Sequence, residues 1–354
     1  MSLLWIDGFD HFTNGANRNL LDDVYVFPGN TGVNDVGVFG VGRTGGRAVF
    51  NDEGGTQIGT PEMFAMVVSG LSTDATWIVG FACRIQHTFT EETEFLQFKD
   101  SSGDFQFTIN YRSGCFNVRQ GSIDATVIGV CKAPPCRTWF FFEIKILFHA
   151  SAGTITIRLN EEEVLALTGL NTAHASGGEL RTNAIWFCGS NSSQRTEYDD
   201  FYICDGAGSL NNNFLGDVAG KRLTPNGNGT TNNFTGSDGD STDNYLQVDE
   251  DGQDTNTYNS STTIGHKDLY AFTNLSSTPS AIAGLHIASY DMTSTSGTFG
   301  HLVRSNVTED LSAAITPGTS FTNHYSVWET DPDTSAAWTE AGVNAAEFGV
   351  EVIS

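Results

Sequence analysis

Carboxylates are the side chains of this sequence whose spacing comes nearest to a catalytic pattern. Two acids a few ångströms apart can cleave a glycosidic bond, one as the proton donor and the other as base or nucleophile. A Glu-x-Asp-x-x-Glu run along one strand would space such acids on a single face of a sheet. Here Glu197 and Asp199 have this spacing, but Tyr202 occupies the final position. The pattern therefore predicts no hydrolytic site in this segment.

Other catalytic and cofactor-binding motifs are absent from the sequence. The eight histidines are scattered singly, and neither His-Glu-x-x-His nor Gly-x-Ser-x-Gly occurs. The run Gly40-Val41-Gly42-Arg43-Thr44-Gly45 matches Gly-x-Gly-x-x-Gly, but a strand-like segment follows it where a dinucleotide site needs a helix. We interpret it as a Gly-rich turn. The sequence thus predicts no catalytic residue, no cofactor and a protein that is not an enzyme.

One acidic stretch offers the hard oxygen ligands that calcium prefers. Its candidate ligands are Asp238, Asp240, Asp243 and Asp249. The stretch does not match an EF-hand loop, because Thr242 occupies a ligand position and the glycine is misplaced. A bound calcium ion and a solvated acidic loop are both open interpretations.

Aromatic side chains are the candidates for a sugar site. Such a site needs exposed rings beside fixed polar groups. Trp186, Tyr198 and Tyr202 lie in two strand-like segments and could supply the rings. On the alternate face of an edge strand they could equally be packed, so both interpretations stay open.

The cysteines all lie in the first 204 residues. They are Cys83, Cys115, Cys131, Cys136, Cys188 and Cys204. None forms a Cys-x-x-Cys pair, and three of them fall within strand-like runs where a thiol behaves as a small hydrophobe. We expect reduced thiols rather than disulfides or a zinc site.

Charge and hydropathy exclude several classes of partner. The formal net charge is −25, with 17 Lys and Arg against 42 Asp and Glu. Such a surface repels phosphate backbones and anionic lipids, so we expect neither a nucleic-acid partner nor membrane binding. The longest apolar stretch, residues 139–148, has the length of a strand. The first residues lack the features of a signal peptide, so we expect the chain to stay where it is made.

The elements that must position these residues are β-strands. In residues 105–111 apolar side chains alternate with Gln106, Thr108 and Asn110, and residues 77–85 are apolar at every odd position. A period of two places one set on the core and the other toward water. Strands this numerous indicate stacked antiparallel sheets and an all-β chain, because a one-sided sheet must bury its apolar face on another layer.

Composition divides the chain into three parts. Strand signals are dense in residues 1–205, which we predict to form one sandwich domain. Residues 206–262 are rich in Gly, Asn, Asp, Ser and Thr, and we predict a linker or an extended docking segment. Strands resume in residues 263–354, which we predict to form a smaller, loop-rich β-domain.

Residues 1–205 resemble a known fold family. Residues 6–10 and 198–205 look like the first and last strands of a concanavalin A-like (laminin G-type) jelly-roll sandwich. Residues 138–145, followed by residues 154–160, are similar to the central hairpin of that fold. The resemblance implies an antiparallel jelly-roll β-sandwich, followed here by the loop-rich smaller β-domain.

The remainder of the chain resembles a tail found on tailed-bacteriophage virion proteins. The segments that carry this resemblance are residues 213–217, 248–250 and 337–350. It implies a non-enzymatic virion structural protein of a tail, baseplate, fibre or capsid surface, which acts in particle assembly through protein–protein contacts. It also implies assembly in the host cytoplasm, other virion proteins as partners, and a homo-oligomer such as a trimer. The alternative is a carbohydrate-binding module that adsorbs to host-surface glycans.

Overall fold

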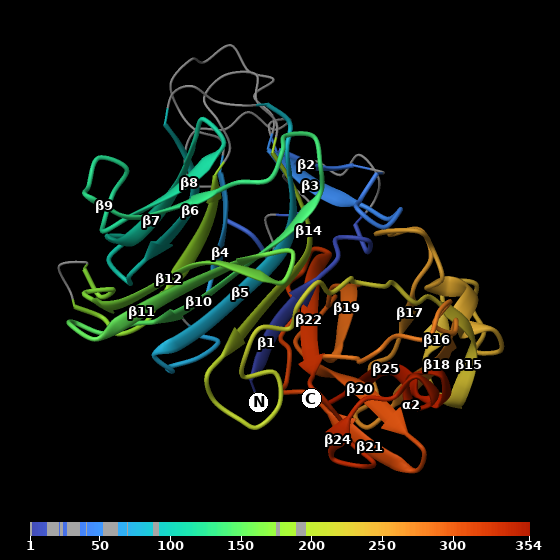
Figure 1. Cartoon of the computed structure of the whole chain (residues 1–354). Helices are drawn as coiled ribbons and strands as arrows, with labels where there is room; N and C mark the ends of the chain where they lie inside the picture. The colour runs from blue at the N-terminus through green and yellow to red at the C-terminus, as the bar shows by residue number, and fades with distance from the viewer. Residues whose placement is uncertain are drawn as a thin grey trace. The chain divides into compact units, whose positions relative to one another are not determined.

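The chain forms two compact units. The computed structural model describes residues 2–12, 21, 24–26, 36–39, 41–51, 63–68, 70–87, 92–174, 178–188 and 196–354. The first unit comprises Met1–Asp10 and Asn14–Gly220, and the second comprises His11–Thr13 and Lys221–Ser354. Almost all regular structure of the described residues is antiparallel β, which confirms the predicted fold class (Figure 1). No helix in these ranges is long and apolar enough to cross a membrane.

The first unit is a β-sandwich of two antiparallel sheets. The eight-stranded sheet runs in the order β12 (Glu162–Leu170), β11 (Gly153–Leu159), β10 (Phe140–Leu147), β5 (Thr76–Ile85), β14 (Thr196–Asp205), β3 (Ala48–Asn51) and β2 (Val36–Phe39), and β1 (Leu3–Asp7) also pairs with β14. The six-stranded sheet runs in the order β4 (Met63–Val67), β13 (Ala184–Cys188), β6 (Thr93–Lys99), β7 (Phe105–Arg112), β8 (Cys115–Arg119) and β9 (Val127–Lys132).

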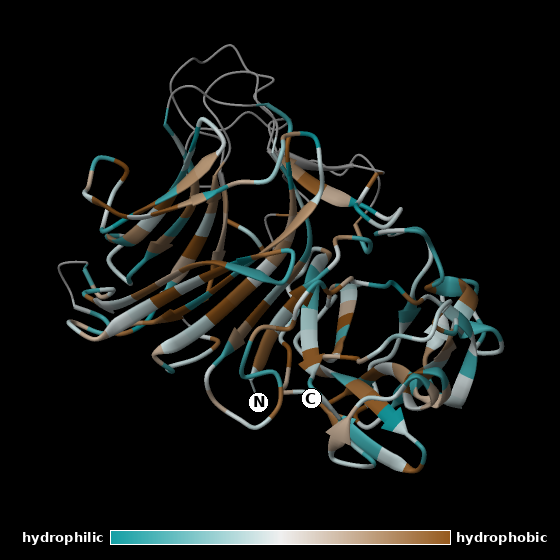
Figure 2. Ribbon diagram, in the orientation of Figure 1, coloured by the Kyte–Doolittle hydropathy of each residue, from teal (hydrophilic) through white to brown (hydrophobic). Residues whose placement is uncertain are grey.

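Phenylalanine rings fill the space between the two sheets. Phe81 and Phe142 of the eight-stranded sheet lie 6.0 and 5.4 Å from Phe95 of the six-stranded sheet, measured between ring centroids. Phe187 of β13 also contacts Phe81, at 5.3 Å. All four rings are almost completely buried, and hydrophobic residues recur along these strands in Figure 2. One set of the alternating side chains thus forms an aromatic core between the sheets, and the other set forms the outward face of each sheet.

The outward face of the eight-stranded sheet is covered by the end of the first unit. Tyr202 lies over Gly80, where a Cβ atom would come within 2.1 Å of the tyrosine ring. The Tyr202 hydroxyl donates to Glu143 and accepts from the Leu215 amide. Gly216 donates its amide to the same Glu143 oxygen, at 2.8 Å. These contacts hold the segment that contains Leu215 and Gly216 against the sheet.

The second unit is built from a five-stranded sheet and shorter strand pairs. The sheet runs in the order β15 (Pro225–Asn232), β18 (Lys267–Phe272), β25 (Glu347–Val352), β20 (Phe299–Ser305) and β21 (Thr308–Leu311). The pairs are β16 (Thr235–Gly236) with β17 (Asn259–Ser260), β19 (Leu285–Asp291) with β22 (Thr322–Trp328), and β23 (Thr330–Asp331) with β24 (Ala336–Ala337). A 3₁₀ helix, η1 (Asn244–Gln247), and the α-helix α2 (Glu340–Ala345) complete it.

Hydrogen bonds order the polar stretch that composition predicted to be a linker or docking segment. Residues 206–220 belong to the first unit, whereas β15, β16, η1 and β17 belong to the second. The amide of the buried Asn244 donates to both carboxylate oxygens of Asp268, at 3.1 and 2.8 Å, and to the Phe234 carbonyl. Tyr270 donates to the same carboxylate at 2.7 Å. The buried polar groups thus replace the apolar contacts that this composition lacks.

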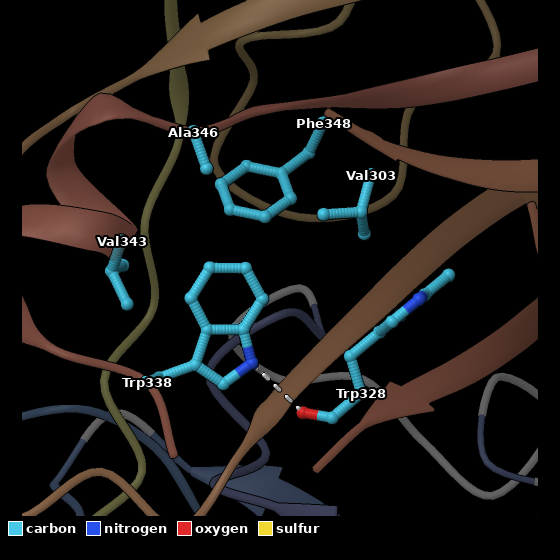
Figure 3. Packing of buried hydrophobic residues seen from close by; sticks show 6 residues of the cluster. All are labelled: Val303, Trp328, Trp338, Val343, Ala346 and Phe348. Atoms are coloured by element: carbon cyan, nitrogen blue, oxygen red, sulfur yellow. Dashed lines mark hydrogen bonds between the residues drawn. The ribbon is translucent and has the colours of Figure 1, made fainter. Parts of the chain in front are cut away.

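A small apolar cluster lies in the second unit. Its buried members are Val303, Trp328, Trp338, Val343, Ala346 and Phe348 (Figure 3). The Trp338 indole donates to the Trp328 carbonyl at 3.2 Å. Thr339 caps α2 by accepting a hydrogen bond from the Gly342 amide, which fixes the turn that carries Val343 into the cluster.

We expect Trp338→Phe to destabilise the protein by about 1–3 kcal/mol, because it leaves the Trp328 carbonyl buried without its donor. The measurement is the unfolding free energy from urea titration, followed by tryptophan fluorescence. Tyr258→Phe, at an exposed ring, is the control and should leave the unfolding midpoint unchanged. Equal midpoints for wild type and Trp338→Phe would contradict the packing described here.

Candidate functional site

The outward face of the six-stranded sheet carries polar side chains that are nevertheless buried. On β7, Phe107 and Ile109 point into the core, so Gln106, Thr108 and Asn110 lie on the opposite face. These three polar residues have no exposed surface. A polar residue is rarely buried on the outer face of a sandwich, so this face requires a physical explanation.

Strand register brings these side chains into rows across the sheet. Trp186 of β13 lies opposite Gln97 of β6, Gln97 lies opposite Thr108, and Thr108 lies opposite Arg119 of β8. A second row places Glu94 opposite Asn110, and Asn110 opposite Asn117. The "polar face" consists of these residues together with Glu92 and Lys99; its members are Glu92, Glu94, Gln97, Lys99, Thr108, Asn110, Asn117, Arg119 and Trp186.

Loop carbonyls satisfy part of this buried polarity. Gln106 donates to the Glu179 carbonyl at 2.9 Å, and Thr108 donates to the Gly121 carbonyl at 2.6 Å. Two amide oxygens of the polar face remain unsatisfied. Gln97 Oε1 and Asn110 Oδ1 are buried and have no hydrogen-bond partner among the described residues. Each such acceptor costs about 1–3 kcal/mol, so both are suited to receive donors from a ligand.

Glu92 is held as an anion at one end of the polar face. Arg119 binds it with two charge-assisted hydrogen bonds, from Nε to Oε1 at 2.9 Å and from Nη2 to Oε2 at 2.5 Å. Asn110 and Asn117 donate to Oε1 at 3.2 and 3.3 Å. Burial alone would raise the pKa of Glu92, but these hydrogen bonds outweigh it and lower the pKa below its ordinary value.

Glu94 has the opposite electrostatic environment. Burial raises the pKa of its carboxyl above the ordinary value, and Asp124 adds to this effect, while Lys99 and a hydrogen bond from Gln97 oppose it. Burial also lowers the pKa of Lys99. The Lys99 ammonium lies 3.1 Å from the centroid of the Trp186 ring and 4.3 Å from that of Phe105. The lysine charge is therefore offset partly by aromatic rings.

The sequence-predicted aromatic residues lie in different environments. Trp186 is half-buried on the polar face. Tyr198 is 1% exposed and packs among the core rings, with its hydroxyl donating to the Cys188 carbonyl. Tyr202 is covered on the other sheet, as described above. The structure thus places Trp186 apart from the two tyrosines, and neither tyrosine presents its ring to solvent.

The acids singled out by the sequence lie in β14, away from the polar face. Glu197 forms an ion pair with Arg84. Asp199 accepts from the Arg43 amide at 2.7 Å, and the Arg43 guanidinium binds Asp200 at 2.8 Å. These contacts dock the Gly-rich segment onto the sheet. Its Gly42 amide donates to the Gly46 carbonyl in a turn before β3, while Gly40 lies outside the described residues.

The acidic residues considered for calcium make local contacts. Asp238 accepts from the Gln247 side chain and the Asp240 amide, and Asp240 accepts from the Thr242 amide. Asp243 precedes η1 and Asp249 follows it, outside this hydrogen-bonded turn. Across the described ranges, no three His, Cys, Asp or Glu side chains come close enough to bind one metal ion. The calcium site stays a prediction of the sequence.

None of the six cysteines forms a disulfide in the part of the chain that the structure describes. Cys115 and Cys136 line a pocket of about 420 Å³ at one end of the six-stranded sheet, next to Tyr111 and Lys132. The Tyr111 hydroxyl lies 3.4 Å from the Cys136 sulfur. This pocket offers thiols and one lysine but no carboxylate, so its chemistry differs from that of the polar face.

Most residues of the polar face were not predicted from the sequence, although two signals pointed to it. The alternation of residues 105–111 already separated Gln106, Thr108 and Asn110 from the core side. Glu92 and Glu94 are two residues apart, a spacing that places two acids on one face of a strand. No local pattern reveals that Asn117, Arg119 and Trp186 lie beside them, because register between distant strands creates that arrangement.

Comparisons with known proteins yield structural similarities alone. No family model and no curated protein matches the chain. Alginate lyase Aly36B is 10% identical, with 58% of this chain and 97% of that chain covered and a TM-score of 0.41. A GH131 β-glucanase catalytic domain from Podospora anserina is 11% identical, with 59% and 98% covered and a TM-score of 0.39. A carbohydrate esterase from the Shiga toxin-encoding bacteriophage phi24B is 11% identical, with 52% and 91% covered and a TM-score of 0.37.

These similarities correct one expectation. The sequence predicted that the protein is not an enzyme, whereas the similar structures are named for an esterase, a lyase and a glucanase. That prediction is wrong because it relied on short motifs. Catalytic groups on the face of a sheet can come from neighbouring strands that are distant in sequence, so the absence of a motif does not exclude them.

Buried acids should make the stability of the first unit fall as the pH rises. Burial raises the pKa of Asp7 to about 7, although Tyr25 and the Phe9 amide donate hydrogen bonds to it. The folded state therefore binds this proton more tightly than the unfolded state does. The stabilisation is complete below about pH 4, which is near the unfolded pKa, and is lost as the pH rises toward 7.

We expect Asp7→Asn to reduce the fall in melting temperature between pH 4.5 and 7.5 by about 2 °C or more, since about 1 kcal/mol shifts a domain of this size by 2–4 °C. Differential scanning calorimetry at several pH values measures this. Asp104→Asn, at an exposed turn residue, is the control and should keep the wild-type slope. An Asp7→Asn slope equal to that of wild type would show that Asp7 does not titrate in this window.

Proposed function

We propose that the first unit binds a polysaccharide on the polar face. The observation that supports this most is the row from Trp186 to Arg119, which places a half-buried indole and a half-buried guanidinium on one face of the sheet, with the buried Gln97 and Thr108 between them. A sugar ring has an apolar face and a rim of hydroxyls, and it needs both kinds of partner. The unsatisfied oxygens of Gln97 and Asn110 would accept hydroxyl donors.

The charges of the polar face favour a neutral polysaccharide over a polyanion. Arg119 is engaged with Glu92, and Lys99 lies against two aromatic rings. A chain with a formal net charge of −25 also repels a polyanion at long range. A neutral polysaccharide is therefore the expected ligand class, with a neutral β-glucan as the probe and a polyanionic polymer as the comparison.

The virion setting is a separate proposal, and it rests on the sequence resemblance of residues 213–217, 248–250 and 337–350. In that setting the glycan site would serve adsorption to the host surface, and other virion proteins or further copies of this chain would be its neighbours. Mass spectrometry of purified phage particles tests it. Absence of the chain from intact particles would overturn the setting without affecting the sugar site.

Trp186→Ala should weaken binding to laminarin, a neutral β-glucan, by at least about tenfold, which corresponds to about 1.4 kcal/mol. Affinity gel electrophoresis with laminarin, and with alginate as the polyanionic comparison, measures the effect. Trp139→Ala is a matched control. Trp139 is also half-buried beneath a cation, Arg84, but it directly precedes β10 of the eight-stranded sheet and is not part of the polar face. Equal losses for both variants, or wild-type protein that binds neither polymer, would overturn the proposal.

A further inference from the structure

Two carboxyl groups of the polar face flank the same asparagine. Glu94 lies directly opposite Asn110 in the β6–β7 register, and Glu92 accepts a hydrogen bond from the Asn110 side chain at 3.2 Å. Glu94 lies in β6 and Glu92 lies directly before the first residue of that strand, so their backbone positions are separated by at most about 7 Å along the chain. Side chains of this length can close that distance to the roughly 5–5.5 Å typical of a retaining glycosidase pair.

We propose that Glu94 and Glu92 hydrolyse a glycosidic bond of the polysaccharide bound on the polar face, with Glu94 as the proton donor and Glu92 as the nucleophile. The inference rests on the proposed function, since the polymer must first lie across Trp186 and Gln97. It assigns a catalytic activity to a site that otherwise only binds.

Electrostatics divide the two roles. A proton donor must stay protonated while the nucleophile beside it stays ionised. Burial raises the pKa of Glu94, whereas hydrogen bonds from Arg119, Asn110 and Asn117 lower that of Glu92. The ionisable groups facing Glu94 are Lys99 on its own strand, Asp124 after β8, and Cys188 on β13. Of these, Lys99 alone favours the anion of Glu94, and its charge lies against Trp186.

The two unsatisfied amide oxygens provide an independent indication of a ligand. Gln97 is 1% exposed and Asn110 is fully buried, and each has one oxygen without a partner among the described residues. The Asn110 side chain donates to Glu92, and Gln97 is close enough to Glu94 to lower the pKa of its carboxyl. Both unsatisfied acceptors therefore belong to side chains that contact the carboxyl pair, where hydroxyls of the cleaved sugar would reach them.

The reaction has two balanced steps. In the first step the Glu94 carboxyl gives its proton to the glycosidic oxygen, the bond from that oxygen to the anomeric carbon breaks, and a Glu92 oxygen bonds to the anomeric carbon. In the second step the Glu94 carboxylate takes a proton from water as the water oxygen attacks the same carbon. The ester to Glu92 then breaks, which releases the sugar with retained configuration and restores both groups.

The test uses the full chain with laminarin and measures both bound polymer and new reducing ends. We expect Glu94→Gln to lose at least about 100-fold in the rate of reducing-end formation while its laminarin binding is kept, because general acid catalysis contributes 10²–10⁴-fold. Glu163→Gln, at an exposed position of β12, is the matched control and should keep the wild-type rate.

Glu92→Ala is the second variant. Its rescue by azide distinguishes a nucleophile from a residue that only stabilises the fold. We expect it to lose at least about 100-fold in rate, and we expect added azide to restore at least tenfold of that loss by forming a glycosyl azide, detected by mass spectrometry. Laminarin binding without any cleavage by the wild type would overturn this inference and leave the proposed function intact. Cleavage by Glu94→Gln at the wild-type rate, or no azide adduct with Glu92→Ala, would overturn it as well. Absence of laminarin binding would instead overturn the proposed function.

Discussion

The packing of aromatic rings between the two sheets is the constraint on which the first unit depends. Phe81, Phe95, Phe142 and Phe187 bring both sheets together within ring-contact distance. Since successive side chains of a strand point to opposite faces, fixing one set in the core also fixes the other set outward. The polar face is therefore a direct consequence of the aromatic core, and a slip of one residue in any of its strands would remove it.

Carboxylates have different uses on the two outward faces. On the eight-stranded sheet Glu143, Asp199 and Asp200 accept hydrogen bonds from tyrosine, arginine and backbone amides, so they hold neighbouring segments in place. On the six-stranded sheet Glu92 is fixed by Arg119, while burial favours the protonated form of Glu94. The same residue type thus holds neighbouring segments in place on one sheet, whereas on the other sheet one carboxylate is paired with an arginine and burial favours the protonated form of its neighbour.

The second unit is stabilised by a small apolar cluster together with buried, hydrogen-bonded polar side chains. A cluster around Trp328, Trp338 and Phe348 supplies its hydrophobic contacts. Elsewhere Asn244 and Asp268 are buried and hydrogen-bonded to each other, which lets a stretch rich in Asn, Asp and Ser become ordered. Buried polar groups of this kind stabilise a fold only when their partners are present, so the segments that supply those partners depend on one another.

The sequence by itself determined the fold class of this protein and much of its strand pattern. Alternation in residues 77–85 and 105–111 is a local property, and it gave β5 and β7 with the correct side toward the core. Tertiary structure alone decided which residues form the candidate site. Glu94, Asn117 and Trp186 come together through pairing of β6 with β7 and β13, and of β7 with β8. Register between strands far apart in sequence is set by core packing, so local patterns indicated single members of the polar face but not which residues lie beside them.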